Sequence, residues 1–317
     1  MKTYPKNLSI LSILVYFGFS ILSSKAFAQN TGAAPKNLPG ATTEIYKTID
    51  SVSLPIHIYT PEGKSSPKAS PAIIFFFGGG WKGGTPAQFE NHCKYLASRG
   101  MVAMTAEYRV SSRHGTTAAS CLRDAKTAMR WARSNAKRLG IDPNRLAAGG
   151  GSAGGHLAAA LGTIVAFEEP YEDLSFSSVP NALALFNPAV VLAPIENKFS
   201  MDAKKIAALG KRLGTSLEAL SPYHHIRKNR PPTIIVHGKA DTTIPFLTVE
   251  LFTNEMIKHG NRCELVGYEN QTHGFFNYGK GDNSMFRATV TEMDNFLKSL
   301  GYLKGKPTID FFMSSIK

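Results

Sequence analysis

RLAAGGGSAGGH, at residues 145–156, joins an apolar run typical of a strand to a segment, continuing to Thr163, that is typical of a helix. Within it, residues 150–154 fit the pattern G-x-S-x-G, in which a serine occupies a sharp turn between a strand and a helix. Small neighbours permit the strained backbone that such a turn requires. The context therefore predicts that the hydroxyl of Ser152 stands exposed at a helix N-terminus, where the helix dipole favours a developing anion.

The same glycines also satisfy a second pattern, the dinucleotide fingerprint G-x-G-x-x-G, at residues 149–154. Residues 78–83 satisfy it as well, and neither match lies in a first strand–helix unit. A dinucleotide-binding domain also needs an acidic residue at the end of its second strand to bind the ribose. The acidic residues at about the right distance, within 168–173, are predicted to lie in a loop instead. These observations favour a nucleophilic serine over a cofactor loop.

Strand and helix patterns alternate on both sides of this turn. A chain of this length with 43% hydrophobic residues can bury one large core, so we expect one catalytic domain, 29–317. The alternation predicts the α/β class, with a mostly parallel central sheet covered by helices on both faces. Between 167 and 223 the alternation breaks down, and we interpret this segment as a small lid insertion over the carboxyl edge of the sheet. Strands are predicted within 42–59 as an antiparallel pair and at 72–77, 101–108, 145–149, 182–186, 233–237 and 263–268, and helices at 86–99, 117–139, 156–163, 203–220, 246–259 and 283–300.

A serine hydroxyl needs a base to take its proton, and a histidine base needs a carboxylate to orient it. Asp241 follows one predicted strand and His273 the next, so both are expected in loops at the same sheet edge as Ser152. The glycine run directly after the first central strand can turn backbone N–H groups toward a substrate carbonyl. Gly79, Gly80 and Ala153 are the predicted donors of this oxyanion hole.

These motifs resemble the bacterial carboxylesterases with an HGGGW-type oxyanion loop, which include hormone-sensitive-lipase-like esterases and bifunctional acetylxylan/feruloyl esterases. The resemblance covers roughly residues 42–301. It implies the α/β-hydrolase fold, the triad and the oxyanion donors named above, and acetyl or feruloyl esters of polysaccharides as substrates. One departure is Phe77, where the family usually has a histidine that steadies the loop through hydrogen bonds. The resemblance is carried by FFFGGGW (75–81), EYR (107–109), GGGSAGGHLA (149–158), HGKADTTIP (237–245) and THGFF (272–276).

The expected chemistry is acyl transfer to water without any cofactor or metal ion. Trp81, His156 and Phe275 are candidates to contact the substrate, although an aromatic beside a glycine loop is often simple packing. A general short-chain carboxylesterase is the nearest alternative function. A peptidase on the same fold is more remote, and a catalytically silent carbohydrate-binding relative is the alternative from another class.

The N-terminus predicts export. Lys2 and Lys6 precede an apolar run, and Ala26-Phe27-Ala28 fits a small-x-small cleavage site, so 1–28 is predicted to be a signal peptide of a periplasmic or secreted protein. An uncleaved anchor is the alternative; the run is too short to span a bilayer comfortably. The formal net charge is +13, but the basic residues are scattered rather than clustered with aromatics, so a nucleic-acid partner is not expected. No oligomeric state is implied.

Three cysteines cannot build a disulfide framework. Cys93 and Cys121 share helical stripes with apolar residues, which predicts buried core thiols. We expect no bridge between these two residues or to Cys263.

Overall fold

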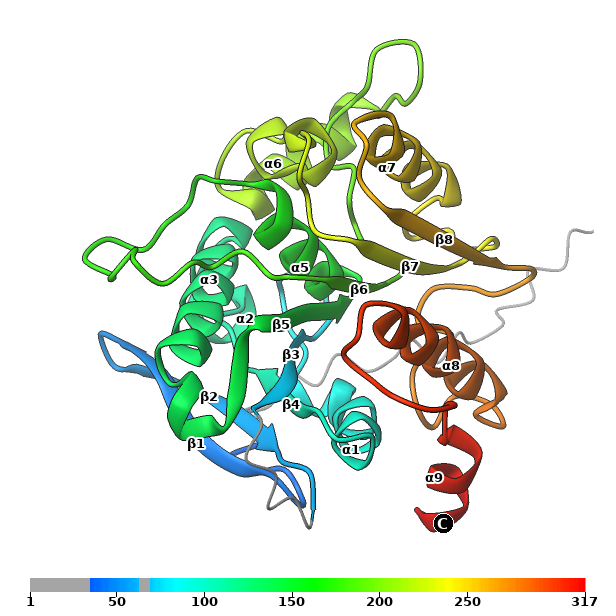
Figure 1. Ribbon diagram of the computed structural model, residues 1–317. Helices are drawn as coiled ribbons and strands as arrows, with labels where there is room; N and C mark the ends of the chain where they lie inside the picture. The colour runs from blue at the N-terminus through cyan, green and yellow to red at the C-terminus, as the bar shows by residue number, and fades with distance from the viewer. Residues whose placement is uncertain (1–34, 63–68, 317) are drawn as a thin grey trace, which may run out of the picture.

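A single eight-stranded sheet organises the computed structural model, which describes residues 35–62 and 69–316 (Figure 1). The strand order is β1-β2-β4-β3-β5-β6-β7-β8. β1 and β2 form an antiparallel hairpin, β2 pairs antiparallel with β4, and all the pairs from β4 through β8 are parallel. The predicted α/β class and the predicted hairpin are confirmed. The strands are β1 Thr42–Ile49, β2 Val52–Tyr59, β3 Ser70–Phe76, β4 Val102–Ala106, β5 Ile141–Gly151, β6 Leu183–Phe186, β7 Thr233–Gly238 and β8 Cys263–Tyr268.

β3 lies in the middle of the sheet and is buried along its whole length. Because side chains of a strand alternate between faces, Ile74 and Phe76 pack into one hydrophobic cluster, and Ile73 and Phe75 pack into the other. A strand buried on both faces must be continuously apolar, as this one is. It therefore delivers the glycine loop that follows it to a fixed place at the carboxyl edge of the sheet.

Helices cover both faces (Figure 1). Buried side chains of α3, α5 and α7 belong to one cluster, and those of α1, α8 and α9 belong to the other. The helices are α1 Glu90–Ser98, α2 Ser111–His114, α3 Ala118–Ser134, α4 Ala136–Leu139, α5 Ala153–Thr163, α6 Ala203–Leu213, α7 Phe246–Lys258, α8 Ser284–Ser299 and α9 Ile309–Ser315, with short 3-10 turns at Pro86–Phe89, Glu218–Leu220 and Pro222–His225.

Two helical predictions differ from the structure. The long helix predicted for 117–139 is interrupted at Asn135, because the backbone of this residue is not α-helical. α3 and α4 are therefore separate helices. The patch at 203–220 is helical as α6 only to Leu213, because Gly214 takes a left-handed conformation at φ +72° that ends the helix. The predictions for Cys93 and Cys121 are confirmed as buried residues, and the cysteines are free thiols.

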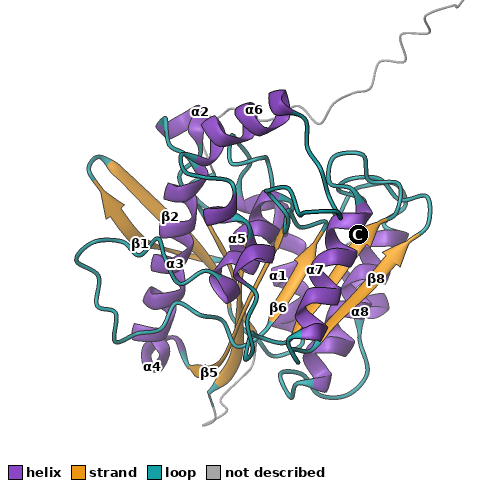
Figure 2. Cartoon of the chain, turned by 90° about the horizontal axis from the view of Figure 1, so that it is seen from above, coloured by secondary structure: helices purple, strands orange, loops and turns teal. Residues whose placement is uncertain are grey.

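The segment 167–223 does not form one lid, which corrects the prediction. Its middle contains β6, a strand of the main sheet. Its first part lies along α3, where Glu168 pairs with Lys126 at 2.7 Å and Glu172 pairs with Arg130 at 3.0 Å. Only the part that carries α6 lies over the carboxyl edge of the sheet (Figure 2).

The predicted signal peptide lies outside the described residues. Among the residues that are described, the structure contains no helix long and apolar enough to cross a membrane.

Glu107, directly after β4, is a buried carboxyl group beside the glycine loop. It accepts a hydrogen bond from Nη2 of Arg113 at 2.7 Å, and Nη1 of Arg113 donates to the backbone oxygen of Gly84 at 3.0 Å. Its second oxygen, Oε2, is buried without a hydrogen-bond partner. Burial raises the pKa of Glu107 to about 7, although the neighbouring Arg113 opposes this shift.

This pKa predicts a pH dependence of stability. Between about pH 4.5 and pH 7 the folded protein keeps a proton on Glu107 that the unfolded chain has lost, so its contribution to stability falls as the pH rises through this window. Urea unfolding should therefore show the wild type losing stability relative to Glu107→Gln as the pH rises from about 5 to 7. Glu44→Gln, which removes a carboxylate paired with Arg138 at the surface, is the control. A difference between wild type and Glu107→Gln that does not change with pH would contradict the assignment.

Candidate active site

Ser152 forms the turn between β5, which ends at Gly151, and α5, which begins at Ala153. Its backbone has φ 54° and ψ −116°, a strained conformation that non-glycine residues rarely adopt. The N–H of Ser152 donates to the backbone oxygen of Phe186 on β6 at 2.9 Å, which anchors the turn to the sheet. A side chain at Gly154 would collide with the backbone oxygen of Phe76, so only glycine lets α5 start this close to β3.

The structure brings the three predicted triad residues together. Nε2 of His273 lies 2.9 Å from Oγ of Ser152, and Nδ1 of His273 lies 2.7 Å from Oδ2 of Asp241. Asp241 lies in the loop after β7 and His273 in the loop after β8, so each comes from the carboxyl end of a parallel strand. A carboxylate at Nδ1 selects the tautomer in which Nδ1 donates and Nε2 accepts the proton of the serine hydroxyl.

Asp241 is held in its charged form. Its Oδ1 accepts hydrogen bonds from the backbone N–H groups of Thr243 at 2.8 Å and Ile244 at 2.9 Å, and Oδ2 accepts one from Nδ2 of Asn187 at 2.8 Å. Burial alone would raise the pKa of Asp241, but the hydrogen bonds from His273 and Ile244 outweigh it and bring the pKa below its ordinary value. The carboxylate therefore stays negative opposite the imidazole.

The glycine loop after β3 reaches the same place. Gly79 has φ +121° and Gly80 has φ +63°, and a side chain at Gly79 would collide with the backbone oxygen of Gly83. Within the described part of the chain, no protein acceptor bonds to the backbone N–H groups of Gly79, Gly80 or Ala153. Gly80 and Ala153 line the pocket that contains Ser152. Unpaired N–H groups beside a serine hydroxyl are suited to bind an oxyanion.

Phe77 holds this loop by packing instead of by the hydrogen bonds of a histidine. Its ring is fully buried and stacks on Tyr108, with centroids 4.1 Å apart and planes 14° apart. The hydroxyl of Tyr108 donates to the backbone oxygen of Phe77 at 2.7 Å. The aromatic pair thus fixes both the side chain and the backbone at the start of the loop.

Gln88 is a residue that the sequence analysis missed. Its Oε1 accepts a hydrogen bond from the N–H of Gly78 at 2.6 Å, and its Nε2 donates to Oδ1 of Asn277 at 2.9 Å. Nδ2 of Asn277 in turn donates to the backbone oxygen of Gly274 at 2.8 Å, the residue after His273. Gln88 therefore links the glycine loop to the loop of His273. A glutamine near a helix start carries no sequence signal for such a contact.

The three predicted substrate-contact residues have different positions. Trp81 lines the pocket. His156 is fully buried beneath it: Nδ1 accepts from Nε1 of Trp81 at 3.3 Å and Nε2 donates to the backbone oxygen of Leu220 at 2.7 Å. Burial lowers the pKa of His156 to about 4, so it is a neutral support. Phe275 is 3% exposed, packs on Tyr268 and does not line the pocket. The structure thus places Trp81 at the pocket, whereas His156 and Phe275 are buried and do not line it.

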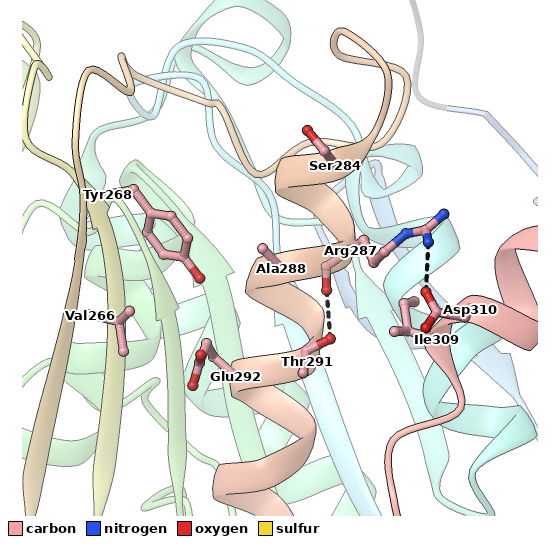
Figure 3. Close-up of a pocket in the computed structure, with 9 residues that line it drawn as sticks. All are labelled: Val266, Tyr268, Ser284, Arg287, Ala288, Thr291, Glu292, Ile309 and Asp310. Atoms are coloured by element: carbon pink, nitrogen blue, oxygen red, sulfur yellow. Dashed lines mark hydrogen bonds and ion pairs between the residues drawn. The ribbon is translucent and has the colours of Figure 1, made fainter.

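The pocket at Ser152 has a volume of about 180 Å³. Its walls come from the glycine loop, from 189–192, from α6 with the residues just before it, and from 243–248. A second hollow of about 370 Å³ lies between β8, α8 and α9, where Arg287 pairs with Asp310 at 2.6 Å (Figure 3). It contains none of the triad residues. Across the described residues, no group of three His, Cys, Asp or Glu side chains could hold a metal ion.

A Ser–His–Asp arrangement at the carboxyl edge of this sheet, beside a loop of unpaired N–H groups, defines an α/β-hydrolase of the carboxylesterase class. The model of the family BD-FAE matches residues 56–256, more than half of the chain, and the chain belongs to this family.

Known proteins that are similar to this chain in sequence or structure include several esterases. Esterase LipC of Mycobacterium tuberculosis is 30% identical over 66% of this chain, which spans 54% of LipC. The acetylxylan esterase of Xylanibacter ruminicola is 27% identical over 65% of this chain, which spans 40% of that enzyme, so the chain covers about half the length or less of these relatives. The apo form of Thermogutta terrifontis esterase 2 is 50% identical, with a TM-score of 0.80 over 84% of this chain and 97% of its own. Structures of that esterase have propionate or butyrate bound.

The link through Gln88 gives a testable expectation. Gln88→Leu removes the acceptor for Gly78 and the donor to Asn277, so the oxyanion donors lose their fixed position. We expect kcat on a soluble ester to fall about tenfold or more, since one well-placed oxyanion donor contributes about 10²–10³ in rate. Lys82→Met, at an exposed neighbour in the same loop, is the control. Equal kcat values for Gln88→Leu and Lys82→Met would show that the link does not position the loop.

Proposed function

We propose that the protein hydrolyses carboxylic esters through an acyl-enzyme on Ser152. His273 takes the proton of the Ser152 hydroxyl as its oxygen attacks the ester carbonyl, and Asp241 stabilises the resulting imidazolium. The tetrahedral oxyanion is bound by the N–H groups of Gly79, Gly80 and Ala153. His273 then protonates the leaving alcohol and activates a water molecule, which releases the acid and restores Ser152.

The observation that carries this proposal is the continuous hydrogen-bond chain from Ser152 through His273 to Asp241, at 2.9 and 2.7 Å. Nucleophile, base and carboxylate are within bonding distance before any substrate binds. The strained backbone of Ser152 supports the same role, since such strain concentrates at functional sites.

For the substrate, we propose acetyl or feruloyl esters of polysaccharides, with hydrolysis in the periplasm or outside the cell. The similarity to an acetylxylan esterase and the predicted signal peptide support this assignment. A pocket of about 180 Å³ is smaller than the 300–1,000 Å³ typical of larger ligands, which favours acetyl over feruloyl groups.

A general short-chain carboxylesterase is the second candidate. The propionate- and butyrate-bound structures of Thermogutta terrifontis esterase 2 favour it. Apolar pocket residues such as Phe199 and Leu209 would accept a short alkyl chain equally well.

The proposed chemistry is tested with p-nitrophenyl acetate and the purified protein. Ser152→Ala should lower kcat by about 10⁴ or more, because a triad acts as a unit and little catalysis remains without its nucleophile. Ser134→Ala, at an exposed serine on α3, is the matched control and should keep full activity. Equal rates for the wild type and Ser152→Ala would refute the esterase and favour a silent carbohydrate-binding relative.

The substrate is tested with acetylated and feruloylated xylan, by measuring which acid is released. Release of acetate in excess of ferulate is the expected result. Hydrolysis of soluble esters with no acid released from either xylan would favour the general short-chain carboxylesterase.

A further inference from the structure

The charged side chains that line the pocket at Ser152 are all positive. Two cationic residues, Lys205 and Arg212, line it from α6, and its lining contains no Asp or Glu among the described residues. Lys205, Leu209 and Arg212 follow the spacing i, i+4, i+7, which places them on one face of the helix. This face of α6 therefore brings positive charge to the pocket, along with one apolar side chain.

Arg212 has no side-chain partner among the described residues. Its Nε is buried without a hydrogen bond, and no ion pair or hydrogen bond joins its guanidinium to another group in the part of the chain that the structure describes. Arg123 and Arg230 also have an Nε that is buried without a partner, but of these three arginines only Arg212 lines the pocket at Ser152. A buried polar atom without a partner costs free energy, so an unpaired Arg212 calls for a group that the protein itself does not supply.

The guanidinium lies close to the glycine loop and lines the same pocket as Ser152. Nη1 of Arg212 would be 3.6 Å from a Cβ built on Gly80, which is one of the proposed oxyanion donors. An ester bound to Ser152 thus has Arg212 within reach of one of its ends. A guanidinium binds a carboxylate through two parallel hydrogen bonds, a geometry that a lone ammonium cannot offer.

We infer that the pocket selects esters that carry a carboxylate, which Arg212 binds with the help of Lys205. This inference rests on the proposed function and specifies its substrate class. The carboxylate could belong to the acyl part, as in a monoester of a dicarboxylic acid, or to the alcohol part, as in an acetylated uronic acid. Both present the same anionic group to the same guanidinium.

A different role for Arg212 makes a different prediction. If its charge only stabilised the oxyanion, it would accelerate neutral and anionic esters alike, because the oxyanion is common to both. Binding a substrate carboxylate instead changes the ratio of their kcat/KM values. This ratio is also independent of how much of a variant is folded, since both esters are measured with the same preparation.

A carboxylate in the acyl part is tested by comparing mono-4-nitrophenyl glutarate with 4-nitrophenyl pentanoate, after subtracting the rate without enzyme. A carboxylate in the alcohol part is tested by comparing acetate release from an O-acetylated methyl glucuronoside with acetate release from the matching glucoside. In at least one pair, Arg212→Met should lower the anionic-to-neutral ratio of kcat/KM about tenfold or more, as expected for a charge-assisted hydrogen bond. Arg212→Lys should retain part of the ratio, and added salt should lower it in the wild type.

Lys211→Met removes the adjacent charge on α6, which is exposed and does not line the pocket, and should leave both ratios unchanged. Ratios that Arg212→Met leaves unchanged in both pairs, while the wild type cleaves the neutral esters, would overturn the inference and leave the proposed function standing. A wild type that cleaves none of the four esters would overturn the proposed function as well.

Discussion

The close approach of α5 to β3 is the constraint on which the rest of the site depends. The helix starts where Gly154 has no room for a side chain against the backbone of Phe76, and the turn before it is strained at Ser152. The strain is tolerated because the sheet holds both sides of the turn, through the full burial of β3 and the bond from Ser152 to Phe186. The core of the protein thus stabilises a backbone conformation that an isolated segment would not keep.

Three loops must meet at this turn, and direct polar contacts join them. Asp241 is fixed by the backbone of its own loop and by Asn187 after β6. Gln88 and Asn277 connect the glycine loop to the loop of His273. Glu107 and Arg113 secure the far end of the glycine loop at Gly84. Each loop that carries a reacting group is therefore tied to another element of the sheet edge and not only to its own strand.

The fold and the positions of Ser152, Asp241 and His273 could be predicted because they follow from order along the chain: each residue lies in the turn or loop after a recognisable strand. Other features depend on which way a side chain points. His156 and Phe275 belong to the motifs around the catalytic residues, but their side chains are buried, which the sequence alone does not show. The strand at 182–186 was predicted and is β6, but the sequence did not show that the segments before and after it lie in different places, one along α3 and the other over the sheet edge. The contacts of Gln88 arise only when segments almost 190 residues apart meet.

α6 has a consequence for how this enzyme could change over time. Only Leu213 of this helix is buried, and Lys205, Leu209 and Arg212 line the pocket. Substitutions on α6 can therefore alter the shape and charge of the pocket at little cost to the stability of the core, because the catalytic groups lie in loops at the sheet edge. Related proteins can then differ in their substrates while they retain the same reaction. For the same reason, α6 is the first segment to vary in engineering a new specificity.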